Sequence, residues 1–174
     1  IVDVGAADGD AGSMSYEFLE NGWSGILVEP LAQYYDKARS LWRNRHDVIV
    51  VPAAITTHTG EVDIHPFNSV TTVDDVWAKH CAAGWKPVKY GPKQTVRCYT
   101  LKSLLETFLS PKRINILKLD TEGHDYQCLT SMDWDGYEVE VVVTETIDMA
   151  NKHRSGGKWP VREEVDVLLK SKGF

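Results

Sequence analysis

The sequence predicts an α/β fold built on a mostly parallel sheet with helices on both of its faces. Apolar strand-like segments alternate with helical segments from residue 1 to residue 51, in the order β-α-β-α-β. Two further apolar runs, 114–119 and 139–143, lie among helical segments in the second half. Such alternation is typical of parallel sheets, because each right-handed crossover helix returns the chain to the same edge of the sheet.

Five segments have the short, continuous apolar character of strands that helices cover on both faces. They lie at residues 1–4, 25–28, 48–51, 114–119 and 139–143. A further strand is expected at residues 61–65, which follow a Thr59-Gly60 turn.

The helices are predicted from apolar spacing and from residues that begin or end helices. Ser13 or Ser15 is placed to cap the first helix, which ends at Asn21-Gly22. Thr100 is placed to cap another, and Pro160 suits the first turn of the last. Helices are therefore expected at residues 16–20, 31–43, 100–109 and 124–131, and from residue 160 onward.

Residues 66–97 interrupt this rhythm with three prolines and several aromatic residues. We expect an irregular insertion over one end of the sheet, with a short helical piece at residues 74–83. Its aromatic side chains either wall a substrate pocket or form a small core of the insertion itself. The aromatic residues concerned are Phe67, Trp77, Trp85 and Tyr90.

Length and charge limit the classes of protein that this chain can represent. Its 174 residues are expected to form a single domain, residues 1–174. A net charge of −6 argues against nucleic acid as the main partner, since phosphate backbones need clustered Lys and Arg. No apolar run approaches the length of a membrane span. Three scattered cysteines without a CxxC motif favour a reducing compartment, so we expect a cytoplasmic protein.

Small or acidic residues follow each of the five predicted strands. In an open parallel sheet, ligands bind outside the carboxyl ends of the strands, near the point where the strand order reverses. The sequence therefore predicts one ligand site at this edge. The residues expected there are the 5–9 turn, Glu29, Ala53, Ala54, residues 120–123 and Glu145.

The turn after the first strand is acidic and does not carry a dinucleotide fingerprint. GxGxxG would place glycines where Ala7 and Asp10 stand. The turn carries three acidic residues, Asp3, Asp8 and Asp10, and these favour a ligand that has a positive amine or sulfonium group. Glu29, after the second strand, is placed to accept hydrogen bonds from both hydroxyls of a ribose. Adenosine joined to a cationic amino acid describes S-adenosylmethionine. An NAD-linked oxidoreductase remains the alternative, because NAD folds place an acid similarly.

The stretch "INILKLDTEGHDYQCL" (residues 114–129), with "IVDVGAADGD", "LVEP" and "TLKSLL", resembles the FkbM-type methyltransferase family. The resemblance runs from Val2 to Phe174. It implies a three-layer, Rossmann-like class I methyltransferase sheet, mostly parallel, and methyl transfer from S-adenosylmethionine, usually to oxygen. That fold has seven strands, and we expect its last two to be missing from these 174 residues or to be contributed elsewhere. A degenerate methyltransferase-like domain that binds without turnover is a further alternative.

The resemblance also implies roles for individual residues. Those assigned to the methionine end of the cofactor are Asp3, Gly5, Ala6, Asp8 and Gly9. Glu29 is assigned to the ribose, and Ala53 and Ala54 lie beside the adenine. Asp120, Glu122 and His124 follow the strand at 114–119, at the edge of the sheet that would face the methyl group, so Asp120 is expected to contact the cofactor amine or the acceptor. The candidate catalytic residues are Asp120, Glu122 and His124. His124 suits a general base because its usual pKa is near 6.5, although a surface histidine is equally consistent with its position. Glu122 alternatively caps the helix that follows.

The acceptor is expected to be a small molecule such as a sugar or natural-product intermediate, with the insertion at 66–97 covering its site. Mg²⁺ is possible but not favoured. Asp120 and Glu145 end neighbouring strands, as metal-binding carboxylates do in catechol-type O-methyltransferases, but only Asp148 is available as a third ligand. No metal ligand is therefore predicted. Three residues of a Gly-rich loop either contact an anionic acceptor or are solvated: His153, Arg154 and Lys158.

Overall fold

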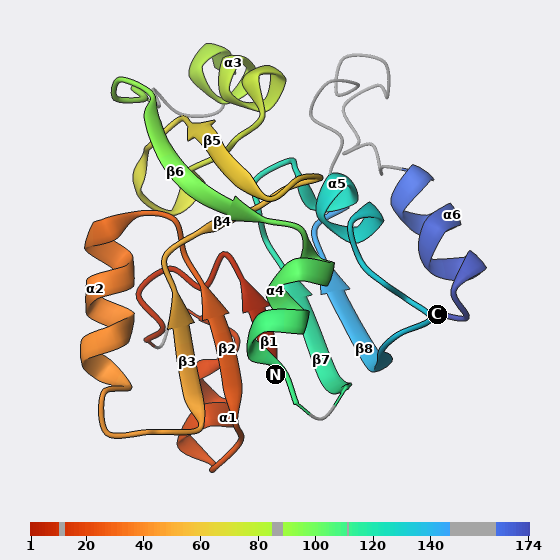
Figure 1. Ribbon diagram of the computed structural model, residues 1–174. Helices are drawn as coiled ribbons and strands as arrows, with labels where there is room; N and C mark the ends of the chain where they lie inside the picture. Colours follow the sequence, from red (N-terminus) through yellow and green to blue (C-terminus); the bar gives the residue numbers. More distant parts are fainter. Residues whose placement is uncertain (11–12, 85–88, 111, 147–162) are drawn as a thin grey trace.

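A computed structural model describes residues 1–10, 13–84, 89–110, 112–146 and 163–174. Its main sheet has five parallel strands in the order β3-β2-β1-β7-β8 (Figure 1). The order reverses between β1 and β7, where an open α/β sheet places its ligand. The predicted strands and their parallel arrangement are confirmed. The bounds are β1 (Val2–Val4), β2 (Gly25–Val28), β3 (Val48–Val51), β7 (Arg113–Leu119) and β8 (Glu138–Thr144).

Helices cover both faces of this sheet, which confirms the three-layer arrangement. α1 (Tyr16–Glu20) and α2 (Ala32–Leu41) belong to one face. The opposite face is covered by α4 (Leu101–Phe108), α5 (Asp125–Thr130) and α6 (Glu163–Ser171). In the part of the chain that the structure describes, no helix is both long and apolar enough to cross a bilayer.

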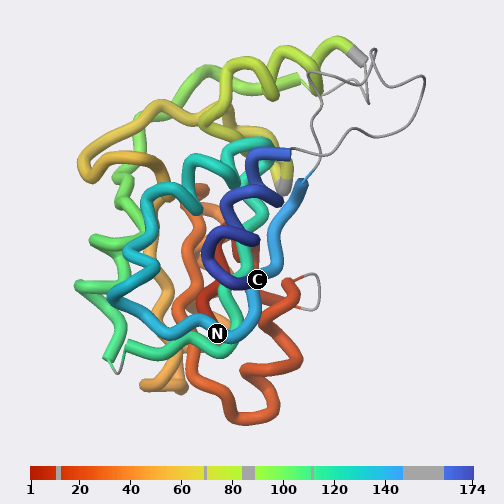
Figure 2. The backbone as a smooth tube through the Cα atoms, turned by 90° about the vertical axis from the view of Figure 1, so that its right-hand side faces the viewer, coloured from red at the N-terminus to blue at the C-terminus, as the bar shows by residue number. Residues whose placement is uncertain are grey.

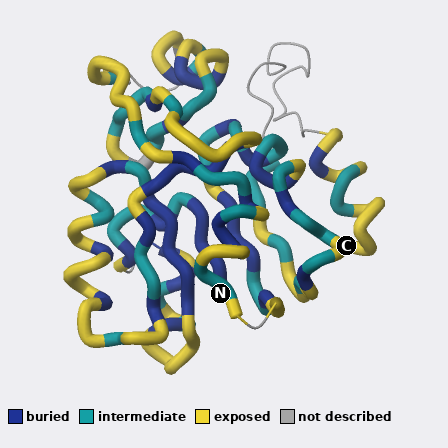
Figure 3. Tube along the Cα trace, in the orientation of Figure 1, coloured by how far each residue is buried: buried dark blue, intermediate teal, exposed yellow. Residues whose placement is uncertain are grey.

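The central strands are mostly buried (Figure 3). Their side chains alternate between two apolar cores, one on each face of the sheet. Val4 and Val28 pack in the core that includes α4 and α5. Leu27 packs in the other core, against Leu19 of α1. Cys128 of α5 is fully buried, as expected of a packed and unreactive thiol.

A second, three-stranded sheet lies above the carboxyl ends of the main strands, together with α3 (Figures 1 and 2). It orders its strands β4-β6-β5, with β6 antiparallel to β5 and parallel to β4. A short 3₁₀ turn, η1, leads into the helix. The bounds are β4 (Ala54–Ile55), β5 (Gly60–Ile64), η1 (Asn68–Val70), α3 (Asp75–Gly84) and β6 (Gln94–Tyr99).

This second sheet corrects one prediction. The expected strand near residues 61–65 and the helical piece near 74–83 are confirmed as β5 and α3. The expectation of irregular structure is wrong for residues 94–97, which belong to β6. Of the residues in β6, only Cys98 is buried, so the strand lacks the apolar run that marks the central strands. Its partner β5 holds it in place by pairing between distant parts of the chain.

The helix starts differ in what their hydroxyl groups bind. Thr100 caps α4 as predicted, because its side chain accepts a hydrogen bond from the Ser103 amide. Ser15 occupies the N-cap position of α1 without capping it. Its hydroxyl donates instead to Oδ2 of Asp3 on β1, at 2.7 Å.

Candidate active site

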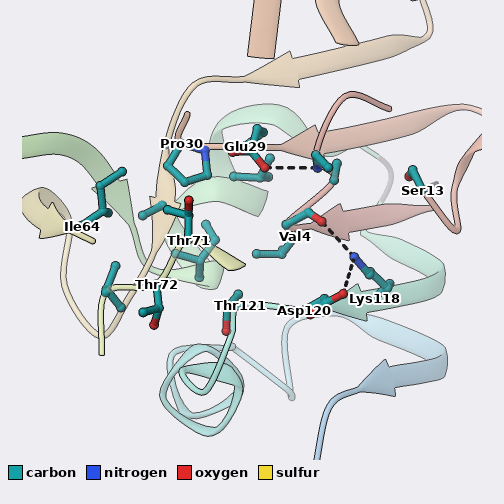
Figure 4. Close-up of a pocket in the computed structure, with 18 of the residues that line it drawn as sticks. Val4, Ser13, Glu29, Pro30, Ile64, Thr71, Thr72, Lys118, Asp120 and Thr121 are labelled. Carbon is teal, nitrogen blue, oxygen red and sulfur yellow. Dashed lines mark hydrogen bonds and ion pairs between the residues drawn. The ribbon is translucent and has the colours of Figure 1, made fainter. Parts of the chain in front are cut away.

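A pocket lies at the carboxyl ends of β1, β2, β3 and β7, beneath the second sheet (Figure 4). Residues following the main strands form one wall, and residues of β5 and the segment after it form the other. The first wall includes Gly5, Ala6, Ala7, Glu29, Pro30, Ala53, Ala54, Lys118, Asp120 and Thr121. The second wall comprises Ile64, Asn68, Thr71, Thr72 and Val73.

Gly5 begins the turn that forms the floor of this pocket. Its φ angle is +78°, and a Cβ added there would lie 2.0 Å from the backbone oxygen of Asp120. Its amide donates to the Val28 carbonyl at 2.9 Å, which ties the turn to the end of β2. Only glycine permits both the backbone conformation and this close approach of β1 to β7.

Glu29 is a buried carboxyl group at the end of β2. Its Oε1 accepts from the Leu31 amide at 2.8 Å, and its Oε2 accepts from the Ala7 amide at 3.1 Å. Burial raises the pKa of Glu29 to about 7. Each oxygen has a second lone pair, so the group retains acceptor capacity toward the pocket.

Lys118 is a site residue that the sequence reasoning did not assign. Its Nζ donates to the Gly5 carbonyl at 2.9 Å and lies 3.1 Å from Oδ1 of Asp3 and 3.7 Å from Oδ2 of Asp120. The residue is only 8% exposed. The signal was present in the sequence as a lone lysine within the apolar strand "INILKL", because a buried lysine needs charged or polar partners.

Three of the residues predicted to bind the cofactor lie outside the pocket lining. Asp3 is fully buried beneath the turn, where Oδ2 accepts from the hydroxyls of Ser13 and Ser15. Asp8 is partly exposed, and its carboxylate lies 3.8 Å from Lys37 Nζ. Gly9 packs against α2, since a Cβ added there would lie 3.1 Å from Cβ of Ala38. The others line the pocket together: Gly5, Ala6, Glu29, Ala53, Ala54 and Asp120.

The three predicted catalytic residues follow β7 but occupy different environments. Asp120 lines the pocket and is exposed. Glu122 accepts a hydrogen bond from Nε1 of Trp77 at 3.2 Å, which places its carboxyl group against the insertion. The capping role predicted for Glu122 as an alternative is not observed, because α5 has His124 at its N-cap position and no side-chain capping bond. His124 occupies the N-cap position of α5, without a side-chain capping bond, and is not among the lining residues.

Glu122 and Gly123 attach the insertion to the loop after β7. Glu122 has a φ angle of +54°, and its carbonyl accepts from Thr72 Oγ1 at 2.7 Å. A Cβ added at Gly123 would lie 2.5 Å from the ring of Trp77. Burial, with Asp120 and Glu145 adding negative charge nearby, raises the pKa of Glu122 to about 8.

The aromatic residues of the insertion form its own small core. Trp77 and Cys81 are buried, with Phe67, Val70 and Tyr90 packed against them. None of the aromatic residues described there is among the pocket-lining residues. Several other predicted residues lie outside the described ranges: Trp85, Asp148, His153, Arg154 and Lys158.

Acidic residues follow several of the central strands, among them Glu29, Asp120 and Glu145. Within the described ranges, no group of three or more His, Cys, Asp or Glu side chains is arranged to hold a metal ion.

The methyltransferase FkbM domain matches residues 3–174 of the chain. The chain belongs to the FkbM methyltransferase family. Searches of curated proteins and of solved structures returned no match to it. The fold agrees with this membership, because this FkbM methyltransferase domain is built on a mostly parallel, Rossmann-like central sheet.

The buried carboxyl groups of the FkbM methyltransferase domain make its stability depend on pH. Glu122 has a pKa of about 8 in the folded protein, against an ordinary value of 4.5. The folded state then binds more protons than the unfolded state, so stability falls as pH rises from about 4.5 to about 8. Glu29 adds to this fall only up to a pH of about 7. Glu122→Gln is expected to reduce the decrease in melting temperature between pH 5 and pH 8.

Circular dichroism melts across this pH range test the expectation. The amide oxygen of the glutamine still accepts from Trp77, so the variant removes the titration and keeps the contact. Glu61→Gln, at an exposed position of β5, is the matched control. A Glu122→Gln profile parallel to that of the wild type would contradict the assignment.

Proposed function

We propose that this protein transfers a methyl group from S-adenosylmethionine to a hydroxyl oxygen of a small molecule, such as a sugar or natural-product intermediate. Family membership supports methyl transfer. The cofactor assignment rests on one observation: the pocket at the strand-order reversal is lined by both the buried carboxyl of Glu29 and the carboxylate of Asp120. Three buried free thiols, Cys81, Cys98 and Cys128, support a reducing, cytoplasmic compartment.

The lining residues suit S-adenosylmethionine along the length of the pocket. Glu29 and Asp120 lie on either side of Val4 (Figure 4). At one side, Glu29 is placed to accept the ribose hydroxyls, and Ala53 and Ala54 leave room for the adenine. At the other, the Asp120 carboxylate suits the cofactor's ammonium group. Neither end provides the glycine pattern that a pyrophosphate needs.

When bound, S-adenosylmethionine supplies an electrophilic methyl group. The protein's own residues then have to orient the acceptor, exclude water and receive its hydroxyl proton. Thr71 and Thr72 from the insertion face the main-sheet wall across the pocket, which supports the insertion as the cover of the acceptor site. Of the three predicted catalytic residues, Asp120 lines the pocket. His124, which follows the same strand, remains the predicted general base.

Thermal unfolding with S-adenosylhomocysteine, with NADH as the comparison ligand, tests the cofactor assignment. A ligand at a hundred times its dissociation constant adds about 2.7 kcal/mol to stability. For a domain of this size the melting temperature is expected to rise by several degrees. Glu29→Ala is expected to abolish most of this rise, because it removes the ribose acceptor, while Glu61→Ala is expected to retain it.

The outcomes separate the competing functions. A rise with S-adenosylhomocysteine alone supports the methyltransferase and justifies an acceptor screen with labelled cofactor and hydroxylated small molecules. A rise with NADH alone would overturn the proposal in favour of an oxidoreductase. Binding of S-adenosylhomocysteine without turnover of any acceptor would indicate the degenerate domain.

A further inference from the structure

The buried ammonium group of Lys118 joins the ends of two central strands. Lys118 on β7 is in register with Asp3 on β1, so the two side chains leave the sheet on the same face. Their charged atoms lie 3.1 Å apart. Asp3 is fully buried, and its other oxygen accepts from Ser13 and Ser15. Lys118 therefore neutralises the charge of Asp3, which is not among the residues that line the pocket.

The same ammonium group also donates a hydrogen bond to a backbone carbonyl beside the pocket. An ammonium group has three N–H donors. One donates to the Gly5 carbonyl at 2.9 Å, and the ammonium group also lies within ion-pair distance of both Asp3 and Asp120. Figure 4 shows Lys118 beside Asp120 at this end of the pocket. The positive charge of Lys118 thus lies directly beside the Gly5 carbonyl. A ligand ammonium group that approached this carbonyl would be repelled by Lys118, so another acceptor at this end of the pocket is favoured.

Asp120 is that acceptor. Its carboxylate lies 3.7 Å from Lys118, farther than Asp3 does, and its side chain is half exposed. One ammonium and two carboxylates leave a net charge of −1 at this wall. Because Asp3 is enclosed and hydrogen-bonded by serines, the excess negative charge is presented to the pocket through Asp120.

We propose that Lys118 is a positioning residue that directs the amino-acid end of the cofactor to Asp120. It engages the Gly5 carbonyl and restrains the Asp120 carboxylate. This inference rests on the proposed use of S-adenosylmethionine. It predicts that Lys118 affects binding of the amino-acid part of the cofactor and leaves binding of the nucleoside part unchanged.

Calorimetric titration with two ligands tests this prediction. S-adenosylhomocysteine carries the amino acid, whereas 5′-methylthioadenosine has the same nucleoside and thioether without it. The variant is Asp3→Asn with Lys118→Met, which removes one charge of each sign, so the wall keeps its net charge and no buried carboxylate is left unpaired. Lys172→Met, at an exposed position near the end of the chain, is the control.

The double variant is expected to bind S-adenosylhomocysteine about 2- to 10-fold more weakly, because the Asp120 side chain is no longer restrained and has to be ordered when the ligand binds. Its affinity for methylthioadenosine is expected to stay equal to that of the wild type, as are both affinities of Lys172→Met. Equal losses for both ligands, or no loss for either, would overturn the positioning role. If the wild type itself does not bind S-adenosylhomocysteine, the proposed function fails, which is a separate result.

Discussion

Gly5→Ala is expected to destabilise the protein by about 4 kcal/mol or more, at the upper end of single substitutions. The alanine Cβ would lie 2.0 Å from the Asp120 carbonyl oxygen. The Cβ is fixed directly to the backbone after β1, and the oxygen belongs to the backbone after β7, so no side chain can move aside to relieve the overlap. Asp120 lies at the end of the pocket wall, so the remaining folded protein should also lose its ligand-induced stabilisation. Urea unfolding with and without S-adenosylhomocysteine measures both effects.

Gly22→Ala is the matched control for the backbone conformation. Its φ angle is +90°, close to the +78° of Gly5, and an added Cβ would meet no atom within 4 Å. The left-handed conformation alone costs about 1–2 kcal/mol for an L-residue. The difference between the two variants therefore isolates the clash with Asp120. Similar losses in both would show that the close approach of β1 to β7 is not what requires Gly5.

Trp77→Ala is expected to cost about 3–5 kcal/mol, the range for removing a buried large aromatic side chain. Trp77 is 3% exposed, forms the core of the insertion and packs against Gly123. Its loss should release the insertion from the loop after β7. Hydrogen exchange in α3 should then be faster than in the wild type. Exchange in the central strands should change less, because these strands have separate cores.

Trp77→Phe distinguishes packing from hydrogen bonding at this contact. Phenylalanine keeps an aromatic ring in the insertion core but cannot donate to Glu122. We expect a loss of about 1 kcal/mol, typical of one hydrogen bond, with α3 still protected from exchange. If Trp77→Ala left the protection of α3 unchanged, the insertion would have to be held by other contacts.

The central sheet could be predicted because each of its strands is a short apolar run that can be recognised within its own segment of the sequence. Segments such as Gly25–Val28 are short apolar runs whose composition indicates a buried strand before its partners are known. The strand β6 has no such mark. Three of its six residues are exposed and one is buried, and its conformation depends on pairing with β5. Pairing between distant segments is not visible in the pattern of one segment.

The site was predictable where position along a strand decides the outcome. Gly5, Glu29 and Asp120 follow strands directly, so the parallel sheet brings them to one pocket. Asp3 lies within its strand, and the sheet turns it away from the pocket into a buried polar network. The contact of Glu122 with Trp77 joins segments that the sequence does not show to be neighbours.

The two chain segments that connect residues 56–97 to the main sheet lie side by side. The chain leaves the main sheet through Ala54 and Ile55 and returns through Cys98 and Tyr99, which are their direct partners in the β4–β6 pairing. A segment whose entry and exit are adjacent can change in length or composition without moving the strands beneath it. Residues 56–97 thus start and finish at one place on the main sheet. Changes within this segment that keep its contacts with Glu122 and Gly123 should therefore alter the second wall of the pocket while the turn at Gly5 and the carboxyl of Glu29 stay in place.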